Sequence, residues 1–519
     1  MTAFILVAGA FTGPYVWRDT AARLAAEGAE VHTVALTGLG RRPAGPAGPA
    51  CPAGPAGPGE AVDLETHIAD VLAVIDSVAV ESGGDIVLVG HDYGIHPALG
   101  AADRRARSVA RIVHLDSGMP RDGVPALAAV PDQRLREELT EGGGVQGSQA
   151  GELPPPTRDA WPRWGSTAGL SEAALDGLTA LAVPQPLGTL LQPLRLTGAV
   201  ATVPVTGVLC TGNGPGIEMV QLMVDLGEPA IQALADPRVT FFELSTGHWP
   251  MLSCPVELAE VLIEAAAGGG HRLKAADAAE PPPHLRPFLL DVPERPRERT
   301  GNTDLYLPEG PGPHPAVVFV HGGPVPAEAR PTPRDWPTLT GYARYVAGHG
   351  AVGVTLDHRL HAVTDYERAA EDVAAAVERV RADPRVDADR IALWFFSGGG
   401  PLTADWLAAP PAWLRCLAAN YPILAPLPSW GVADTRFHPA RAVAHAGQLP
   451  VVLARAGREM AEIAATVEEF LTAARRCGAD VEVVDVPEGR HGFETLGPTD
   501  EARDAVRRAV EAVLARLTA

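Results

Sequence analysis

The feature that most constrains the fold is an alternation of short β-branched segments with longer helical segments, which runs along the chain twice. The short segments of the first half are 3–8, 31–35, 86–89, 112–115, 205–210 and 240–243. Those of the second half are 316–320, 352–356, 391–395, 416–419, 451–454 and 481–484. Between them lie Ala-, Leu- and Arg-rich segments with a helical period, for example 65–78 and 366–381. This alternation is typical of βαβ units around a parallel sheet, so we predict two doubly wound α/β domains.

A stretch rich in Gly and Pro near the middle of the 519 residues predicts the boundary between the domains. It begins with three glycines at 268–270 and ends with three prolines at 281–283, and this composition interrupts helices and strands. We therefore predict a first domain over 1–267, a linker over 268–284 and a second domain over 285–519.

Two other stretches of the first half depart from the alternation. Residues 43–59 form a Pro/Gly/Ala tract, which predicts a surface loop within the domain. Residues from about 121 to 200 form an insertion that contains Trp161 and Trp164, and we expect it to be a helical cap. A cap with these aromatic residues would exclude water and shape an apolar pocket.

The charge balance and the cysteines narrow the class of protein. The chain has 42 Lys and Arg against 63 Asp and Glu, a net charge of −21, which argues against binding to nucleic acid or to an anionic membrane. The cysteines are scattered without a CxxC pair, which argues against a disulfide scaffold or a zinc site and fits a reducing compartment. They are Cys51, Cys210, Cys254, Cys416 and Cys477. The apolar run at 4–8 is short and has no Lys or Arg before it, so we predict a buried strand and a soluble, cytoplasmic protein.

A serine in the second half has the surroundings of an activated nucleophile. Ser397 follows the predicted strand 391–395 and precedes Gly398 and Gly399. A strand, then Ser, then small residues that open a helix predict the tight turn called a nucleophile elbow. The alternative is a purely structural role for Ser397, as a helix N-cap.

Three other motifs of the second half complete a catalytic pattern. His321, Gly322 and Gly323 follow a predicted strand, where backbone N–H groups can face a developing oxyanion. Glu459 and His491 follow the last two predicted strands. The order Ser, acid, His is that of the α/β-hydrolase fold, and it differs from the orders in chymotrypsin and subtilisin. His491 could otherwise be an ordinary loop histidine.

Over nearly its whole length, the second half resembles the dienelactone-hydrolase and acyl-peptidase branch of the α/β-hydrolases. That resemblance implies hydrolysis of esters, lactones, amides or thioesters through Ser acylation, with Gly322, Gly323 and Gly398 around the substrate carbonyl. The sequence departs from the family pattern at Phe395, where Gly is usual, and at Glu459, where Asp is commoner. Glu can orient an imidazole as Asp does.

The first half has a similar elbow, but a carboxylate stands at the nucleophile position. The predicted strand 86–89 leads into Gly90-His91-Asp92-Tyr93-Gly94, and Gly247-His248-Trp249-Pro250-Met251 follows the last strand. With the stretches 6–11, 39–41, 64–67 and 114–120, these motifs resemble the branch of plant methyl esterases, hydroxynitrile lyases and small bacterial esterases. An Asp at the elbow is also what epoxide hydrolases and haloalkane dehalogenases use.

Three interpretations of Asp92 stay open. It could be an SN2 nucleophile whose ester intermediate is cleaved by water that His248 activates. Asp92 and His248 could instead act as an acid–base pair in proton transfer, addition, elimination or C–C bond formation. The domain could also be inactive and serve as a binding or pseudo-dimer scaffold. Each of the two halves allows this silent alternative.

Several positions of the first half depart from a hydrolase pattern. Asn213 stands where the acid normally follows the strand 205–210, and Asp116 could substitute from the preceding strand. Ala8 replaces the usual oxyanion-loop His, and Ile95 replaces the second elbow glycine. The predicted cap has no Tyr to protonate an opening epoxide oxygen.

We expect an apolar, uncharged or weakly charged small molecule as substrate, because the predicted cap is aromatic and no basic cluster lies near either elbow. The residues expected around it in the first half are Ala10, Phe11, Tyr93, Trp161, Trp164 and Trp249. A tandem with modified motifs fits the tailoring of a secondary metabolite. No cofactor is expected, and His91, His96 and His114 are expected to pack rather than to bind a metal, because no carboxylate or Cys sits at ligand spacing. The pattern leaves the oligomeric state open.

Overall fold

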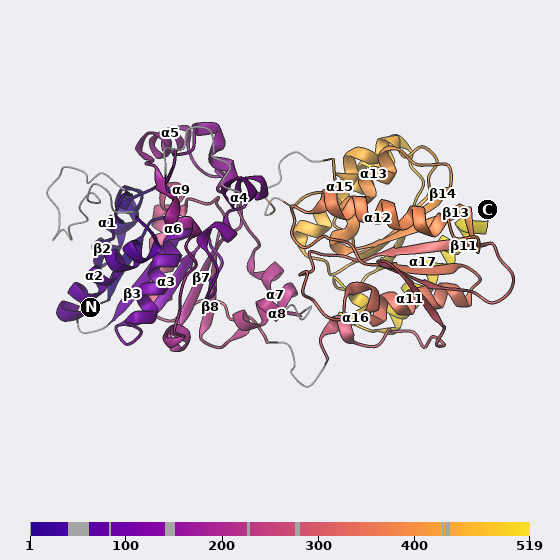
Figure 1. Ribbon diagram of the computed structural model, residues 1–519, viewed down its shortest axis with the longest axis horizontal. Coiled ribbons are helices and arrows are strands. Elements are labelled where there is room, and N and C mark those ends of the chain that lie inside the picture. Colours follow the sequence, from indigo (N-terminus) through magenta and orange to yellow (C-terminus); the bar gives the residue numbers. More distant parts are fainter. Residues whose placement is uncertain are drawn as a thin grey trace. The chain divides into compact units, whose positions relative to one another are not determined.

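The computed structural model describes residues 2–39, 62–82, 85–140, 151–225, 229–275, 281–427, 430 and 436–518. The chain divides into two compact units, residues 1–224 with 229–275 and residues 276–519 with 225–228 (Figure 1). Each unit has its own mainly parallel sheet, in agreement with the predicted α/β class. The Pro/Gly/Ala tract at 43–59 lies outside the described residues.

The first unit is built on a parallel sheet with the strand order β2-β1-β3-β4-β7-β8. The strands are β1 (Ala3–Val7), β2 (Glu30–Thr33), β3 (Ile86–His91), β4 (Val109–Leu115), β7 (Val205–Cys210) and β8 (Val239–Leu244). The helices outside the insertion are α1 (Arg18–Ala26), α2 (Leu64–Ser82), α3 (Ile95–Arg104), α7 (Ile217–Asp225), α8 (Pro229–Gln232), α9 (Pro250–Ser253) and α10 (Pro255–Ala266). Helix α1 packs against α10, and α2 packs against α3.

The insertion between β4 and β7 contains short helices and one small two-stranded sheet. Its elements are α4 (Gln133–Thr140), β5 (Glu152–Leu153), α5 (Glu172–Leu181), β6 (Gln185–Pro186) and α6 (Leu187–Leu191). Strand β5 pairs with β6 in antiparallel fashion, apart from the main sheet. After α10, the chain still belongs to the first unit, because Phe241 of β8 and His271 form an antiparallel bridge. Residues 268–275, which begin the predicted linker, therefore pack with the first unit.

The second unit has a sheet with the strand order β16-β15-β14-β13-β11-β12-β10-β9. Its strands are β9 (Arg297–Thr300), β10 (Thr303–Tyr306), β11 (His314–Val320), β12 (Val352–Leu356), β13 (Val386–Phe396), β14 (Leu414–Asn420), β15 (Val451–Ala456) and β16 (Val481–Val486). Its helices are α11 (Pro337–Gly348), α12 (Tyr366–Arg381), α13 (Thr403–Ala408), α14 (Pro439–Ala442), α15 (Ala461–Cys477), α16 (Phe493–Leu496) and α17 (Asp500–Thr518). All pairs from β16 to β12 are parallel, whereas β10 is antiparallel to both β12 and β9.

Alternate side chains of β11 enter two separate cores, one on each face of the second sheet. Val318 and Val320 belong to the core that includes α12 and α15, whereas Val317 and Phe319 belong to the core that includes α11 and α17. Figure 1 shows these helix pairs on opposite faces of the sheet. A strand buried on both faces must be apolar throughout, which explains the unbroken hydrophobic run at 316–320.

The predicted strands of both halves are confirmed, with ends that differ by a few residues. The hairpin β9–β10 is an element that the sequence did not indicate. Strand β9 reads Arg-Glu-Arg-Thr and is exposed at the sheet edge, so it has no apolar alternation to mark it. Within the described ranges, no helix is both long and apolar enough to cross a bilayer.

Candidate active sites

Ser397 lies at a sharp turn between β13 and a short helical segment. Its φ of +49° lies in the left-handed region that side-chain-bearing residues rarely adopt. The following glycines permit this turn, because a Cβ on Gly398 would lie 2.0 Å from the carbonyl oxygen of Gly323. A Cβ on Gly400 would lie 2.2 Å from the carbonyl oxygen of Ile423. The local sequence therefore gives the backbone geometry of a nucleophile elbow.

His491 connects Ser397 to a buried carboxylate. The Oγ atom of Ser397 lies 2.6 Å from Nε2 of His491, and Nδ1 of His491 lies 2.8 Å from Oε2 of Glu459. Glu459 follows β15, His491 follows β16, and their side chains are 5% and 4% exposed. Proton transfer from Ser397 to Nε2 requires a hydrogen on Nδ1, which the Glu459 carboxylate accepts. The three side chains have the geometry of a Ser-His-Glu triad.

The glycine loop after β11 runs along the elbow of the second unit. A Cβ on Gly322 would lie 3.0 Å from the Cβ of Ser397, so the loop and the nucleophile are in close contact. The hydroxyl of Tyr366 donates a 2.7 Å hydrogen bond to the carbonyl oxygen of Gly398. This bond fixes the peptide group between Gly398 and Gly399. Tyr366 was not identified from the sequence, because an aromatic residue at the start of a helix such as α12 is most simply explained by packing in the core.

Asp92 occupies the matching position of the first unit. Its φ is also +49°. A Cβ on Gly94 would lie 2.5 Å from the carbonyl oxygen of Ala8, and one on Gly90 would lie 2.5 Å from the Cα of Ile95. Gly90 and Gly94 therefore occupy both glycine positions of the elbow, and the expectation that Ile95 replaces the second of them is wrong.

The two carboxylate oxygens of Asp92 have different surroundings. Oδ2 accepts a 3.1 Å hydrogen bond from the backbone N–H of Ala10, in the loop after β1. Oδ1 lies 3.7 Å from Nε2 of His248. This is an ion-pair contact that is longer than a direct hydrogen bond, and Nε2 has no other hydrogen-bond partner. The side chain of Asp92 is 29% exposed, so a small molecule can reach it.

The carboxylate partner of His248 is Asp116. Nδ1 of His248 lies 2.6 Å from Oδ2 of Asp116, and the same oxygen accepts a 2.7 Å hydrogen bond from the side-chain amide of Asn213. The other oxygen of Asp116 accepts from the backbone N–H of Cys210 at 3.1 Å. Asn213 in turn accepts a 2.6 Å hydrogen bond from the N–H of Ser166 in the insertion. Asn213 therefore supports the acid instead of replacing it.

His248 lies between two carboxylates of the first site, those of Asp116 and Asp92. Burial disfavours the imidazolium of His248, but its contacts with Asp116 and Asp92 outweigh this effect and raise its pKa to about 10. Burial also disfavours the Asp92 carboxylate, but His248, His91 and the N–H of Tyr93 hold its pKa well below its usual range. His91 differs, because burial and the neighbouring His248 lower its pKa to about 4. At neutral pH, Asp92 and His248 therefore form an ion pair beside a neutral His91.

Four of the predicted aromatic residues of the first unit form a series of ring contacts that reaches His248. Phe11 contacts the rings of Trp161 and Trp164, Trp161 contacts Trp249, and Trp249 contacts His248. The N–H of Phe11 donates a 2.9 Å hydrogen bond to Gln185 of the insertion. Gln185 was missed from the sequence, because one amide among many polar residues of a cap gives no signal.

Tyr93 lies beside Asp92 but points into the unit. Its hydroxyl is 2.7 Å from Nδ1 of His67, and its ring is stacked with that of His96. His114 has its Nδ1 2.6 Å from the carbonyl oxygen of Ser117. Among the described residues, no group of three or more His, Cys, Asp or Glu side chains could hold a metal ion.

Comparisons with known proteins match the first unit. The model of the alpha/beta hydrolase family matches residues 4–261. The carbendazim hydrolyzing esterase of Nocardioides sp. strain SG-4G is 32% identical over 263 residues, which are 50% of this chain and 98% of that protein. The chain belongs to the alpha/beta hydrolase family, and it is an enzyme of the hydrolase type.

Two solved structures are similar to about half of the chain. An extracellular α/β-hydrolase from a Paenibacillus species is 19% identical, with a TM-score of 0.39, over 51% of this chain and 99% of that one. Tomato methylketone synthase I in complex with 2-tridecanone is 18% identical, with a TM-score of 0.38, over 51% of this chain and 98% of that one.

Proposed function

We propose that the second unit hydrolyses esters or related acyl compounds through Ser397. The observation that supports this proposal most strongly is the continuous chain of contacts from Ser397 through His491 to Glu459, at 2.6 and 2.8 Å. A base within hydrogen-bond reach of a partly exposed Ser hydroxyl on a strained turn is what nucleophilic catalysis requires.

In this proposal, the Oγ atom of Ser397 attacks the carbonyl carbon while Nε2 of His491 takes the hydroxyl proton. The oxyanion develops beside the backbone N–H groups of Gly323 and Gly398, which lie against the elbow. His491 then gives the proton to the leaving group, and an acyl-enzyme forms on Ser397. Water attacks this ester by the same route in reverse and releases the acid.

The experiment is steady-state hydrolysis of p-nitrophenyl esters with acyl chains of two to eight carbons. We expect turnover by the native chain, and loss of about 10³-fold or more in kcat on Ser397→Ala. Asp92→Asn is the matched control at the other elbow, and it should leave this turnover unchanged. Equal turnover by native protein and Ser397→Ala would exclude the proposal.

For the first unit, we infer a second activity on an apolar small molecule, with Asp92 and His248 as the reacting pair. The specific observation is the hydrogen bond from the Ala10 N–H to Oδ2 of Asp92. In a Ser esterase, a loop amide at this place would bind the oxyanion of the substrate. Here the amide is committed to a protein carboxylate, which disfavours a tetrahedral oxyanion at this site.

Two routes remain for this pair, and the geometry favours acid–base chemistry. In an SN2 displacement, the leaving group departs on the side away from the attacking oxygen. Nε2 of His248 lies beside that oxygen, at 3.7 Å from Oδ1, and is badly placed to protonate a leaving oxygen. The insertion has no Tyr to do so. Proton transfer, addition, elimination or C–C bond formation next to a carbonyl needs only the adjacent acid and base.

The aromatic surroundings support an apolar substrate at the first site, and we propose an aryl compound of secondary metabolism. Hydrolysis is the alternative reaction at this site, because the relative from Nocardioides is a carbendazim hydrolyzing esterase. The Asp at the elbow is the reason that we propose a different reaction, and isotope labelling of Asp92 separates the two.

A further inference from the structure

A segment outside the triad holds the glycine loop of the second unit. Residues 357–361 follow β12, and we call them the β12 strap. The carbonyl oxygen of Leu360 accepts a 2.9 Å hydrogen bond from the N–H of Val325, and Nδ1 of His361 donates to the carbonyl oxygen of Val325 at 2.8 Å. The strap therefore runs beside the loop that begins at His321.

The closest contact between strap and loop is a pair of stacked imidazoles. The rings of His321 and His358 are 3.6 Å apart between centroids, with 9° between their planes. Nε2 of His358 donates a 3.0 Å hydrogen bond to the carbonyl oxygen of His321, and the N–H of His358 approaches Nε2 of His321 at 3.4 Å. Both side chains are buried.

The hydrogen bonds give each ring one donor and one acceptor nitrogen. In His321, Nδ1 donates to the carbonyl oxygen of Gly322 at 2.5 Å, so Nε2 is the acceptor. In His358, Nε2 donates, and Nδ1 accepts from the N–H of Leu360 at 3.3 Å. Both rings are therefore neutral, in agreement with the lowering of both pKa values by burial. The stack fixes two successive peptide groups of the loop, at His321 and Gly322.

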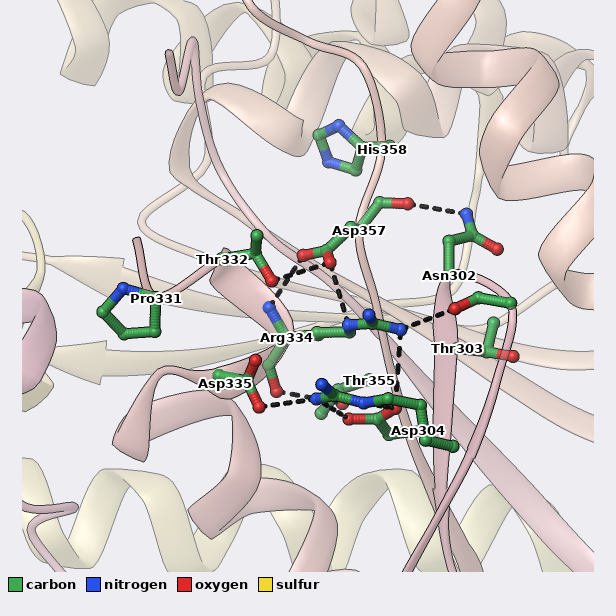
Figure 2. Close-up of polar contacts among 12 residues, drawn as sticks. Asn302, Thr303, Asp304, Pro331, Thr332, Arg334, Asp335, Thr355, Asp357 and His358 are labelled. Atoms are coloured by element: carbon green, nitrogen blue, oxygen red, sulfur yellow. Dashed lines mark hydrogen bonds and ion pairs between the residues drawn. The ribbon is translucent and has the colours of Figure 1, made fainter. Parts of the chain in front are cut away.

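A network of charges holds the start of the strap (Figure 2). The Asp357 carboxylate accepts from the Thr332 hydroxyl at 2.8 Å and from the backbone N–H of Arg334 at 3.0 Å, and Nε of Arg334 lies 3.0 Å away. The backbone of Asp357 pairs with Asn302 twice, because its N–H donates to the Asn302 carbonyl at 2.9 Å and its carbonyl accepts from the Asn302 amide at 2.7 Å. Asn302 lies in the turn between β9 and β10, so the edge hairpin anchors the strap.

The same network is continued by a fully buried carboxylate on β10. Asp304 binds Arg299 through both oxygens, at 2.9 and 2.8 Å, and lies 3.6 Å from Arg334. An isolated buried charge of this kind would be costly, and its arginine partners compensate it. At the other side of the strap, Arg359 forms an ion pair with Asp372 of α12 at 2.9 Å. The backbone on both sides of His358 is therefore fixed.

We propose that His358 is a positioning residue for the glycine loop after β11, and that it acts through its stack with His321. The loop lies against Ser397, as the 3.0 Å approach of a Cβ on Gly322 to the Ser397 Cβ shows. A shift of the loop would move its N–H groups away from the oxyanion, while the triad and the binding of the acyl chain would stay intact. This inference rests on the proposed function of Ser397.

The test compares native protein with His358→Ala and His358→Gln on one p-nitrophenyl ester and on its thionoester. We expect His358→Ala to lower kcat by about 10²-fold, the order of loss for a misplacement of about 1 Å, with KM little changed. The preference for the ester over the thionoester should also fall, because sulfur is a weaker acceptor for the loop N–H groups.

His358→Gln should recover part of kcat, because its amide can donate to the carbonyl oxygen of His321. His349→Ala is the matched control, since His349 is exposed at the end of α11. If His358→Ala does not fold, the kcat and the ester preference of His358→Gln decide, and values equal to the native ones overturn the inference. Native kcat and ester preference in a folded His358→Ala overturn it while the function of Ser397 stands. Absence of turnover in the native protein overturns both.

Discussion

The Oδ2 atom of Asp116 lies 2.6 Å from Nδ1 of His248, although Asp116 follows β4, whereas His248 follows β8 and the neighbour of β8 in the sheet is β7. In the second unit, the acid Glu459 follows β15, which matches β7 in the strand order. The residue that matches Asp116 there is Tyr421, and both have a positive φ, +46° and +36°. The two units therefore supply the acid of the histidine from different strands of the same architecture.

The Asp116–His248 contact makes the stability of the first unit depend on pH. Asp116→Asn is nearly isosteric, and at pH 6 we expect it to lower the free energy of unfolding by about 3 kcal/mol, as is usual when one partner of a buried ion pair is removed. The pKa of His248 is about 10 in the folded chain against 6.5 in a model peptide. Its stabilising contribution is therefore complete below about pH 6.5 and is lost as the pH rises through 10.

Urea unfolding followed by circular dichroism at pH 6, 8 and 10 measures this difference between native and variant protein. Asp19→Asn on the exposed face of α1 is the control, and its effect should be small at every pH. A difference between native and Asp116→Asn that stays constant from pH 6 to pH 10 would show that His248 is not the group involved.

Isotopes distinguish the two routes at Asp92. With styrene oxide in H₂¹⁸O, an SN2 route puts ¹⁸O into the Asp92 carboxylate over several turnovers, because water attacks the carboxyl carbon of the ester. We expect no label in the peptide that contains Asp92. We expect instead that the chain exchanges the α-protons of an apolar aryl ketone with D₂O, and that Asp92→Asn abolishes the exchange. Label in Asp92 would establish the displacement route.

Glu459 orients His491 in the second unit, so its charge is needed for turnover. Glu459→Gln keeps the size of the side chain but replaces the acceptor of the His491 N–H, and we expect a loss of about 10²- to 10⁴-fold in kcat for a p-nitrophenyl ester. Glu462→Gln, on the exposed side of the first turn of α15, is the matched control. If both variants have the same kcat, Glu459 is not the acid of the triad.

Gly398 is restricted to glycine by the loop that faces it. A Cβ there would lie 2.0 Å from the carbonyl oxygen of Gly323, closer than any real contact, so Gly398→Ala must displace the glycine loop. We expect a folded variant with kcat lowered by about 10²-fold or more. Gly447→Ala is a control for the general effect of the substitution, because a Cβ there has no neighbour within 4 Å. The left-handed backbone of Gly447 adds conformational strain to this control variant. Native-like kcat in Gly398→Ala would show that the loop does not serve the reaction.

The sequence predicted the sheets and both elbows because these depend on local patterns. A strand buried on both faces, such as β11, is recognisable from its apolar run, and the turns at Asp92 and Ser397 are recognisable from the small residues that they need. Asp116 was identified only as a possible substitute for the acid. Its role depends on the contact between Asp116 and His248, which are 132 residues apart in the chain. No local pattern encodes such a contact.

The parts of the second site that the sequence did not indicate are also long-range. His358 follows β12, and its sequence neighbours Asp357 and Arg359 indicate no more than a turn with a loop ion pair. Its stack with His321 arises because β11 and β12 are neighbours in the sheet, so that the loops after them meet. The edge hairpin that anchors the strap has no regular apolar alternation on β9, and Asp304 on its second strand is buried beside three arginines.

The most direct test of Ser397 as an activated nucleophile is covalent labelling of the native chain with a fluorophosphonate, followed by mass spectrometry of its peptides. A Ser hydroxyl that is activated by His491 attacks phosphorus, fluoride leaves, and a stable phosphonate ester stays on the oxygen. We expect one label, on Ser397, that is absent in Ser397→Ala and unaffected by Asp92→Asn. Folded native protein that takes up no label, or a label that persists in Ser397→Ala, would contradict it.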